Sequence, residues 1–176
     1  MTPNMRYVYV DTQYIHAFIF FNSIARPNEE KRFAKEQFNS ILHRQDNFSL
    51  KIPMVAMGEI FNNIHRKDLT DQDNDDIIRQ LLHMMSVDKV DIVPPKLECF
   101  EVTTDLLSRD NRLDNTDTLI VSQALCDPLS TYLLMKDQKV IRSAAIQDVN
   151  NELVENGTRL KPLNITPEIN RIREAI

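Results

Sequence analysis

Glycine is scarce in this chain. Only Gly58 and Gly157 occur among its 176 residues, and neither belongs to a G-x-G-x-x-G or G-x-x-x-x-G-K pattern. Such patterns hold nucleotide phosphates because glycine lets the backbone N–H groups approach them closely. The sequence therefore excludes a nucleotide-binding loop of either kind.

Cysteine is equally scarce. Cys99 and Cys126 are the only two, and they are not in C-x-x-C spacing. Both stand among apolar residues of predicted helices, so we interpret them as buried thiols rather than zinc ligands. This use of cysteine fits a reducing, cytoplasmic compartment.

Long apolar runs and an excess of positive charge are also missing. The longest apolar stretch, at 15–21, is interrupted by His16. It is far shorter than the roughly 20 residues that span a membrane. The start Met-Thr-Pro-Asn has no feature of a signal peptide. We therefore expect no membrane association. The net charge of −5 argues against a broad basic surface for nucleic acid, and leaves a local basic strip possible.

Short apolar runs alternate with helical patterns along the chain. Strands are predicted at 7–10, 90–93, 131–135 and 161–165. Helices are predicted at 13–25, 28–43, 54–64, 68–85, 97–108 and 114–127, just after 137, and near 148–155. This alternation predicts an α/β protein, a three-layer α/β/α sandwich around a short parallel sheet. We expect a single domain over 1–165 and a C-terminal helical tail over 166–176.

Four acidic residues stand where an apolar run stops or a helix begins. They are separated by 48, 58 and 20 positions, and they are Asp11, Glu59, Asp117 and Asp137. In a parallel sheet, the carboxyl ends of the strands and the first turns of the following helices share one crevice. We therefore expect these four side chains to converge.

Converging carboxylates imply a metal ion. Close carboxylates repel one another, and some stay protonated unless a divalent cation neutralises them. Ligation by oxygen alone suits Mg²⁺ or Mn²⁺ better than zinc. Such an ion can polarise a phosphodiester and lower the pKa of an attacking water, so the natural reaction is phosphodiester hydrolysis. Whether one ion or two would bind is left open.

Four stretches occur in an order and spacing that carry a family resemblance. They are Tyr-Val-Tyr-Val-Asp-Thr at 7–12, Met-Gly-Glu-Ile at 57–60, Asp-Thr-Leu-Ile-Val-Ser-Gln-Ala at 117–124 and Leu-Leu-Met-Lys-Asp at 133–137. In these stretches the chain resembles PIN-domain proteins, the metal-dependent ribonucleases that include VapC-type toxins and RNA-processing nucleases. The resemblance spans roughly residues 7–145.

The resemblance implies a PIN-like fold and a set of site residues. It assigns the catalytic, metal-binding role to Asp11, Glu59, Asp117 and Asp137. It offers Asp114 as an auxiliary ligand, although Asp114 could equally be a helix cap. It also implies a Mg²⁺- or Mn²⁺-dependent endoribonuclease with RNA as substrate and an antitoxin or RNA-processing protein as partner. Dimers are common among similar proteins, so a homodimer is left open.

Two neighbours of the acids bear on this assignment. The family often has Thr or Ser two residues before the last acid, where this chain has Met135. This departure puts the support of Asp137, and full activity, in question. Thr12 follows the first acid and could orient a ligand or a water, or simply hydrogen-bond to the nearby backbone.

Basic residues flank two of the acids and are candidates for holding RNA phosphates. They are Lys136, Lys139, Arg142 and Arg112. The alternative interpretation is ordinary solvated surface charge.

Other functions stay open on sequence grounds. A PIN-like module that binds RNA or protein without cleaving is the main alternative. A phosphatase with Asp11 as nucleophile usually needs a second Asp two residues later, where this chain has Gln13. Within the nuclease interpretation, a toxin competes with a housekeeping RNA-processing enzyme.

Overall fold

A five-stranded, wholly parallel sheet forms the middle layer of the molecule. In this computed structural model the described residues are 6–21, 29–42, 48–66 and 69–168. The strand order is β3-β2-β1-β4-β5. The strands are β1 (Arg6–Val10), β2 (Phe48–Pro53), β3 (Val90–Val93), β4 (Ser130–Leu134) and β5 (Asn164–Thr166).

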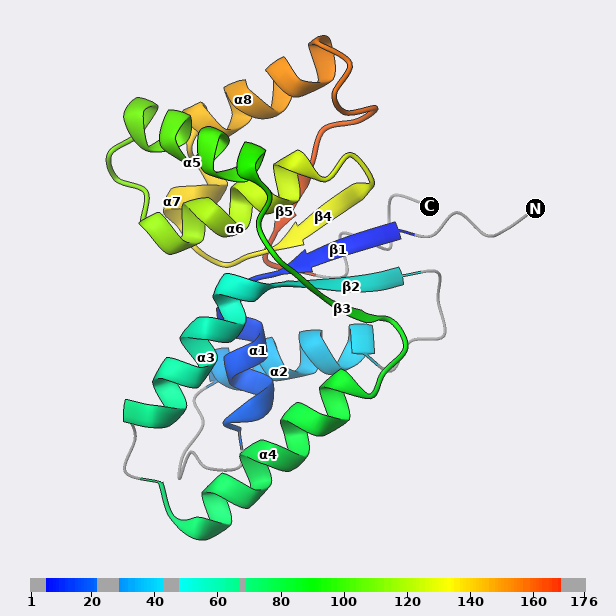
Figure 1. The fold of residues 1–176 in the computed structure, drawn as a ribbon, viewed down its shortest axis with the longest axis vertical. Helices are drawn as coiled ribbons and strands as arrows, with labels where there is room; N and C mark the ends of the chain where they lie inside the picture. The colour runs from blue at the N-terminus through cyan, green and yellow to red at the C-terminus, as the bar shows by residue number, and fades with distance from the viewer. Residues whose placement is uncertain (1–5, 22–28, 43–47, 67–68, 169–176) are drawn as a thin grey trace, which may run out of the picture.

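Two groups of helices cover the two faces of this sheet (Figure 1). One layer holds the helices of the first half of the chain, α1 (Thr12–Ile19), α2 (Glu29–Leu42), α3 (Met54–Arg66) and α4 (Asp71–Met85). The other holds α5 (Leu97–Arg109), α6 (Asn115–Cys126), α7 (Gln138–Ile141) and α8 (Ala144–Glu155). The predicted three-layer α/β/α sandwich is confirmed.

The central strands form because their residues suit a sheet that is buried on both faces. β1 reads Arg-Tyr-Val-Tyr-Val and β4 reads Ser-Thr-Tyr-Leu-Leu, and aromatic and branched side chains pack well on a pleated surface. Val10, Leu133 and Leu134 are completely buried. At roughly 25 cal/mol per Å² of apolar surface, burial of this kind is the main force holding the layers together.

Strand β2 was missed by the sequence analysis, which predicted nothing between its second helix and Met54. Phe48, Leu50 and Ile52 alternate with polar residues, which is a strand signal. The polar positions are accommodated inside the molecule: the Lys51 ammonium pairs with Asp127 at 2.5 Å and lies 4.2 Å from the centre of the Tyr7 ring. Without that partner, a lysine in an inner strand looks like a loop residue.

Most other elements match their predictions within a few residues. The helix predicted at 68–85 is observed as α4, which begins at Asp71, and Thr70 caps it in a reciprocal pair with Asp73. The predicted helix near 148–155 begins earlier, at Ala144, because Ser143 caps it. The predicted caps and helix ends at Asn28 and His43 lie outside the described residues.

The last strand crosses the predicted domain boundary at residue 165. β5 ends at Thr166, and the Tyr14 hydroxyl donates to the Pro167 carbonyl at 2.7 Å. Residues 166–168 therefore belong to the fold rather than to a separate tail, and the rest of the predicted helical tail lies outside the described residues. Within the described ranges, no helix has the length and apolar character needed to cross a membrane.

A buried arginine holds the end of α6 against the start of β4. Arg159 is 2% exposed. Its Nη1 lies 3.0, 2.8 and 2.7 Å from the carbonyl oxygens of Ala124, Leu125 and Asp127, and its Nη2 donates to the Ser130 carbonyl. A helix end leaves such carbonyls without partners, and a cation there also complements the helix dipole. Arg159 thus satisfies acceptors that would otherwise be buried and unpaired.

We expect Arg159→Met to destabilise the protein by about 3 kcal/mol or more, because it leaves several buried carbonyl groups unsatisfied. Chemical denaturation of the variant and the wild type measures the difference. The control is Arg142→Met, which removes an exposed arginine and should change stability by less than about 0.5 kcal/mol. Equal stability of the two variants would contradict the role given to Arg159.

Candidate functional site

The topology brings the four predicted acids to the side of the sheet where the carboxyl ends of its parallel strands lie. β1 is paired with β4 on one side and with β2 on the other, and the chain order reverses between β1 and β4. Asp11 follows β1 and Asp137 follows β4. Ligand sites of open α/β sheets lie at such a reversal point, beyond the carboxyl ends of the strands.

Helices α3 and α6 deliver the other two acids to the same place. α3 follows β2 without a loop and carries Glu59 in its second turn, and α6 carries Asp117 in its first turn. The two helices contact each other across this edge of the sheet. The predicted convergence therefore has a physical basis in one strand pair and one helix pair.

Asp11 is the most deeply buried of the four. It is 1% exposed, its backbone N–H donates to the Leu134 carbonyl at 3.0 Å, and its Oδ2 has no hydrogen-bond partner. Burial, and after it the charge of Asp117, raise the pKa of Asp11 to about 7, although the hydrogen bond from the backbone N–H of Thr12 opposes the rise. A buried carboxylate oxygen without a partner is costly, so it calls for a proton or a cation.

Asp117 lies among the other acids. Burial and then the charges of Asp114, Asp137 and Glu59 raise the pKa of Asp117 to about 6. A carboxyl group in such surroundings keeps its proton to a higher pH unless a cation neutralises the charges around it. At the carboxyl group of Asp117, protonation and cation binding would therefore compete.

The remaining acids are each held by a nearby donor. The Thr12 hydroxyl donates to Glu59 Oε2 at 2.5 Å. The side chain of Asp137 accepts from the Lys139 N–H at 2.7 Å and caps α7. Asp114 accepts from the Thr116 N–H at 2.8 Å and caps α6. Thr12 thus contacts a site residue, and the helix-cap interpretation of Asp114 is confirmed.

In this arrangement the acids are neighbours, but they do not enclose an ion. Across the part of the chain that the structure describes, no three His, Cys, Asp or Glu side chains lie close enough together to hold one. Their chemistry nevertheless fits Mg²⁺ or Mn²⁺, because the donors are carboxylate oxygens and Asp11 presents a buried, unpartnered one. Binding would require the outer carboxylates to turn away from their present donors.

Met135 lies two residues before Asp137, at the position where the sequence raised the question of a supporting hydroxyl group. Its side chain is completely buried, and its backbone N–H donates to the Thr166 carbonyl at 3.0 Å. The side chain therefore belongs to the hydrophobic core, and the backbone continues the pairing of β4 with β5. In the arrangement described here, Asp137 takes its hydrogen bond from the start of α7 instead.

The predicted RNA contacts fall into two groups. Lys136 forms an ion pair with Glu30 of α2 at 2.7 Å, and Arg112 pairs with Asp110 at 2.8 Å. Lys139 and Arg142, in contrast, are exposed, Lys139 within the short helix that Asp137 caps and Arg142 at its other end. The second pair is the better placed to meet a phosphate backbone.

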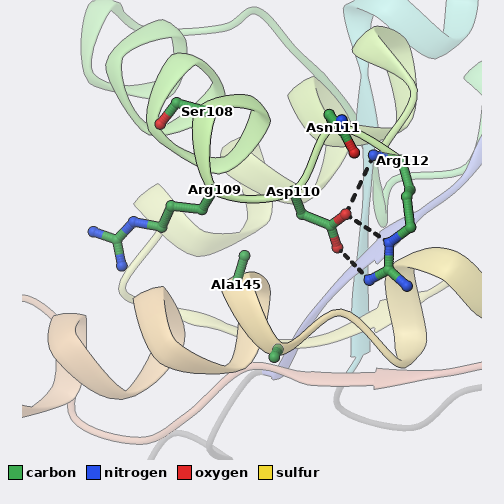
Figure 2. Close-up of a pocket in the computed structure, with 7 residues that line it drawn as sticks. Ser108, Arg109, Asp110, Asn111, Arg112 and Ala145 are labelled. Atoms are coloured by element: carbon green, nitrogen blue, oxygen red, sulfur yellow. Dashed lines mark hydrogen bonds and ion pairs between the residues drawn. The ribbon is translucent and has the colours of Figure 1, made fainter.

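A separate cavity of about 460 Å³ lies between the α5–α6 loop and the start of α8 (Figure 2). Its lining includes Arg109, Asp110 and Arg112 and none of the four predicted acids. The Arg112 guanidinium holds the pKa of Asp110 well below its usual range, and the Ser143 hydroxyl donates to the same carboxylate at 2.9 Å. Since its cations are already neutralised, we place the chemistry at the acids rather than in this cavity.

Asp110 is a structural anchor that the sequence analysis missed. It links the α5–α6 loop to Ser143, the residue that caps α8. Nothing in the local sequence marks it, because its partner Ser143 lies 33 residues away.

Comparisons with known proteins show the fold. No protein-family model and no curated protein matches the chain. Among solved structures, it is similar to VapBC2 from Rickettsia felis bound to a DNA fragment from its promoter, with a TM-score of 0.55, 13% identity, and 90% of this chain and 98% of that chain covered.

Two further solved structures are similar to the same extent. FitAcB from Neisseria gonorrhoeae gives a TM-score of 0.57 at 12% identity, covering 91% of this chain and 97% of that one. FitAB bound to the IR36 DNA fragment gives 0.54 at 12% identity, covering 90% and 94%. At these identities the similarity shows the PIN-like α/β/α architecture and no more.

The raised pKa values predict how stability depends on pH in the absence of metal. A carboxyl whose pKa rises on folding binds its proton more tightly in the folded state, so stability falls as pH rises from its unfolded value near 4 to its folded value. For Asp117 and Asp11 those folded values are about 6 and 7.

We therefore expect Asp117→Asn to be more stable than the wild type by about 1–2 kcal/mol at pH 8 in EDTA, and by much less at pH 5, because Asn cannot acquire the repelling charge. Urea denaturation at both pH values measures the difference. The control is Asp148→Asn, at an exposed site on α8, which should behave like the wild type. A loss of stability in Asp117→Asn at pH 8 would mean that Asp117 is a structural residue.

Proposed function

We propose that this protein is a Mg²⁺- or Mn²⁺-dependent endoribonuclease that hydrolyses RNA phosphodiester bonds. The observation that carries the proposal is the buried, unpartnered carboxylate oxygen of Asp11, in a neighbourhood that also contains Glu59 and Asp117. The order and spacing of the four stretches that resemble PIN-domain proteins support it, and so does the PIN-like architecture.

Asp11, Glu59, Asp117 and Asp137 would hold the ion, with Asp114 beside them. A divalent ion bound there would polarise the scissile phosphodiester and make a bound water more acidic. Without it, the raised pKa values of Asp11 and Asp117 favour the protonated form of these two carboxyl groups. Binding would release such protons, so metal affinity should increase as pH rises through the range of about 6 to 7.

The remaining residues of the site would position the acids and the substrate. The Thr12 hydroxyl fixes the orientation of Glu59. Lys139 and Arg142, exposed within the short helix that Asp137 caps and at its other end, would contact phosphates on either side of the scissile bond. Such contacts read no sequence, so they leave the base preference undefined.

Cleavage of labelled RNAs in Mn²⁺, Mg²⁺ or EDTA tests the proposal. We expect metal-dependent products with the wild type and a loss of at least about 100-fold in rate with Asp117→Asn, because one charged ligand is removed while the fold is kept. Asp148→Asn, purified in the same way, should cleave like the wild type. If Asp117→Asn cleaves as well as Asp148→Asn, the proposed site is wrong.

A PIN-like module that binds RNA without cleaving it is the second candidate. The observation that favours it is the present engagement of the acids: Glu59, Asp114 and Asp137 each accept a hydrogen bond from a nearby donor. The buried side chain of Met135 favours it too, because no hydroxyl is available there to support Asp137. Tight RNA binding with no product at millimolar Mn²⁺ would select this function.

We further propose that the nuclease acts with a protein partner. The similarity to a VapBC2 complex supports a toxin restrained by an antitoxin, and an RNA-processing enzyme with an assembly partner is the alternative. Induced expression in a bacterial host distinguishes them. If the protein is a toxin, growth should stop with the wild type and continue with Asp11→Ala, which removes the central acid. Harmless expression of a protein that cleaves RNA in vitro would indicate the processing role.

A further inference from the structure

A lysine beside the four acids is held by a helix from a distant part of the chain. Lys136 directly precedes Asp137, between the end of β4 and the start of α7. Its ammonium group donates to Oε1 of Glu30 in α2 at 2.7 Å, and it lies 5.9 Å from the centre of the Phe33 ring in the same helix. The first turns of α2 therefore meet the loop that carries one of the proposed metal ligands.

The two members of this ion pair differ in their exposure to solvent. The side chain of Lys136 is 17% exposed, whereas that of Glu30 is 65% exposed. A mostly buried ammonium group is costly without an anionic partner. An exposed carboxylate gains little from an ion pair, so it can turn into solvent at small cost. The lysine therefore needs an anion, while the glutamate can be replaced by another one.

The ion pair of Arg112 with Asp110 has the opposite arrangement. Asp110 is buried and also accepts from the Ser143 hydroxyl, whereas the Arg112 side chain is 67% exposed. The Asp110 carboxylate is thus fixed by its contact with the residue that caps α8. Of these two ion pairs, only that of Lys136 is built so that its carboxylate can be exchanged.

A phosphate of RNA is a suitable replacement for the Glu30 carboxylate. Each phosphodiester carries one negative charge and presents oxygen atoms that accept hydrogen bonds. An ammonium group binds phosphate as a point charge, so the exchange requires no precise orientation. A phosphate at Lys136 would lie next to Asp137, and therefore next to the proposed site of cleavage.

We propose, on the premise that RNA is the substrate as proposed above, that Lys136 is a phosphate-binding subsite and that the Glu30 carboxylate occupies it until RNA binds. A phosphate oxygen would then take the place of Glu30 Oε1, and the glutamate would turn into solvent. The ammonium group stays paired in both states. Glu30 therefore competes with RNA, and α2 takes part in substrate binding although it carries none of the four acids.

Binding of a short, fluorescently labelled single-stranded RNA tests this competition. Anisotropy is measured in EDTA at low salt, where no metal-dependent cleavage occurs. We expect Glu30→Gln to tighten binding by about 3- to 10-fold, because it removes the competing charge from the subsite. Lys136→Met should weaken binding by about the same factor. In the Lys136→Met background, Glu30→Gln should change the affinity by less than about 2-fold, because the two residues act through one contact.

Glu29→Gln is the matched control. Glu29 is exposed in the same turn of α2, and its substitution removes the same charge. We expect it to change RNA affinity by less than about 2-fold, because salt and water screen an exposed charge that does not occupy the subsite. Equal tightening by Glu29→Gln and Glu30→Gln would assign the effect to net charge and overturn the subsite.

Unchanged or weaker RNA binding by Glu30→Gln would mean that the ion pair only holds α2 in place, and would also overturn the subsite, as would a lack of RNA binding by every variant. Cleavage in Mn²⁺, measured separately, keeps this result distinct from that of the proposed nuclease. The expected affinities in a protein that cleaves no RNA would support the subsite and reject the nuclease. Cleavage by a protein whose affinity is the same in Glu30→Gln would do the reverse.

Discussion

The pairing of β1 with strands on both of its edges is the constraint on which the molecule depends. β2 and β4 both hydrogen-bond to it in parallel, and the other two strands attach outside them. This position buries the end of β1, where the Asp11 N–H continues the ladder to Leu134. Asp11 is therefore almost completely buried. The pairing that completes the sheet thus makes the charged form of its carboxyl group costly.

Contacts elsewhere in the molecule offset the cost of burying these acids. Burial of several acids close together opposes folding, while the apolar core and a few long-range polar anchors favour it. Arg159 secures the end of α6, and Asp110 joins Ser143 to the loop that precedes α6. Both ends of the helix that carries Asp117 are thus fixed by residues outside the site, which prevents the helix from moving away and relieving the repulsion.

The sequence predicts the layers and the place of the acids, because both depend on local patterns. Apolar runs mark β1 and β4, and Asp11 and Asp137 follow them directly. β2 was missed because Lys51 looks unsuitable for an inner strand until its partner Asp127, 76 residues later, is known. The engagement of Glu59 by Thr12 and of Lys136 by Glu30 likewise depends on side chains far apart in the chain. Metal binding and RNA contacts remain predictions, since they depend on partners beyond the chain itself.

The strand order also sets the sequence of events during synthesis. Tyr7 of β1 lies opposite Ser130 of β4, so the central strand keeps one edge open until a strand more than 120 positions later has been made. Contacts between such distant segments close late and slow folding. An emerging chain carries Asp11 and Glu59 long before Asp117 and Asp137 exist. The four acids can come together only after β4 and Asp137 have been made, 126 positions after Asp11, so the site is one of the last features of the sheet to be completed as the chain emerges.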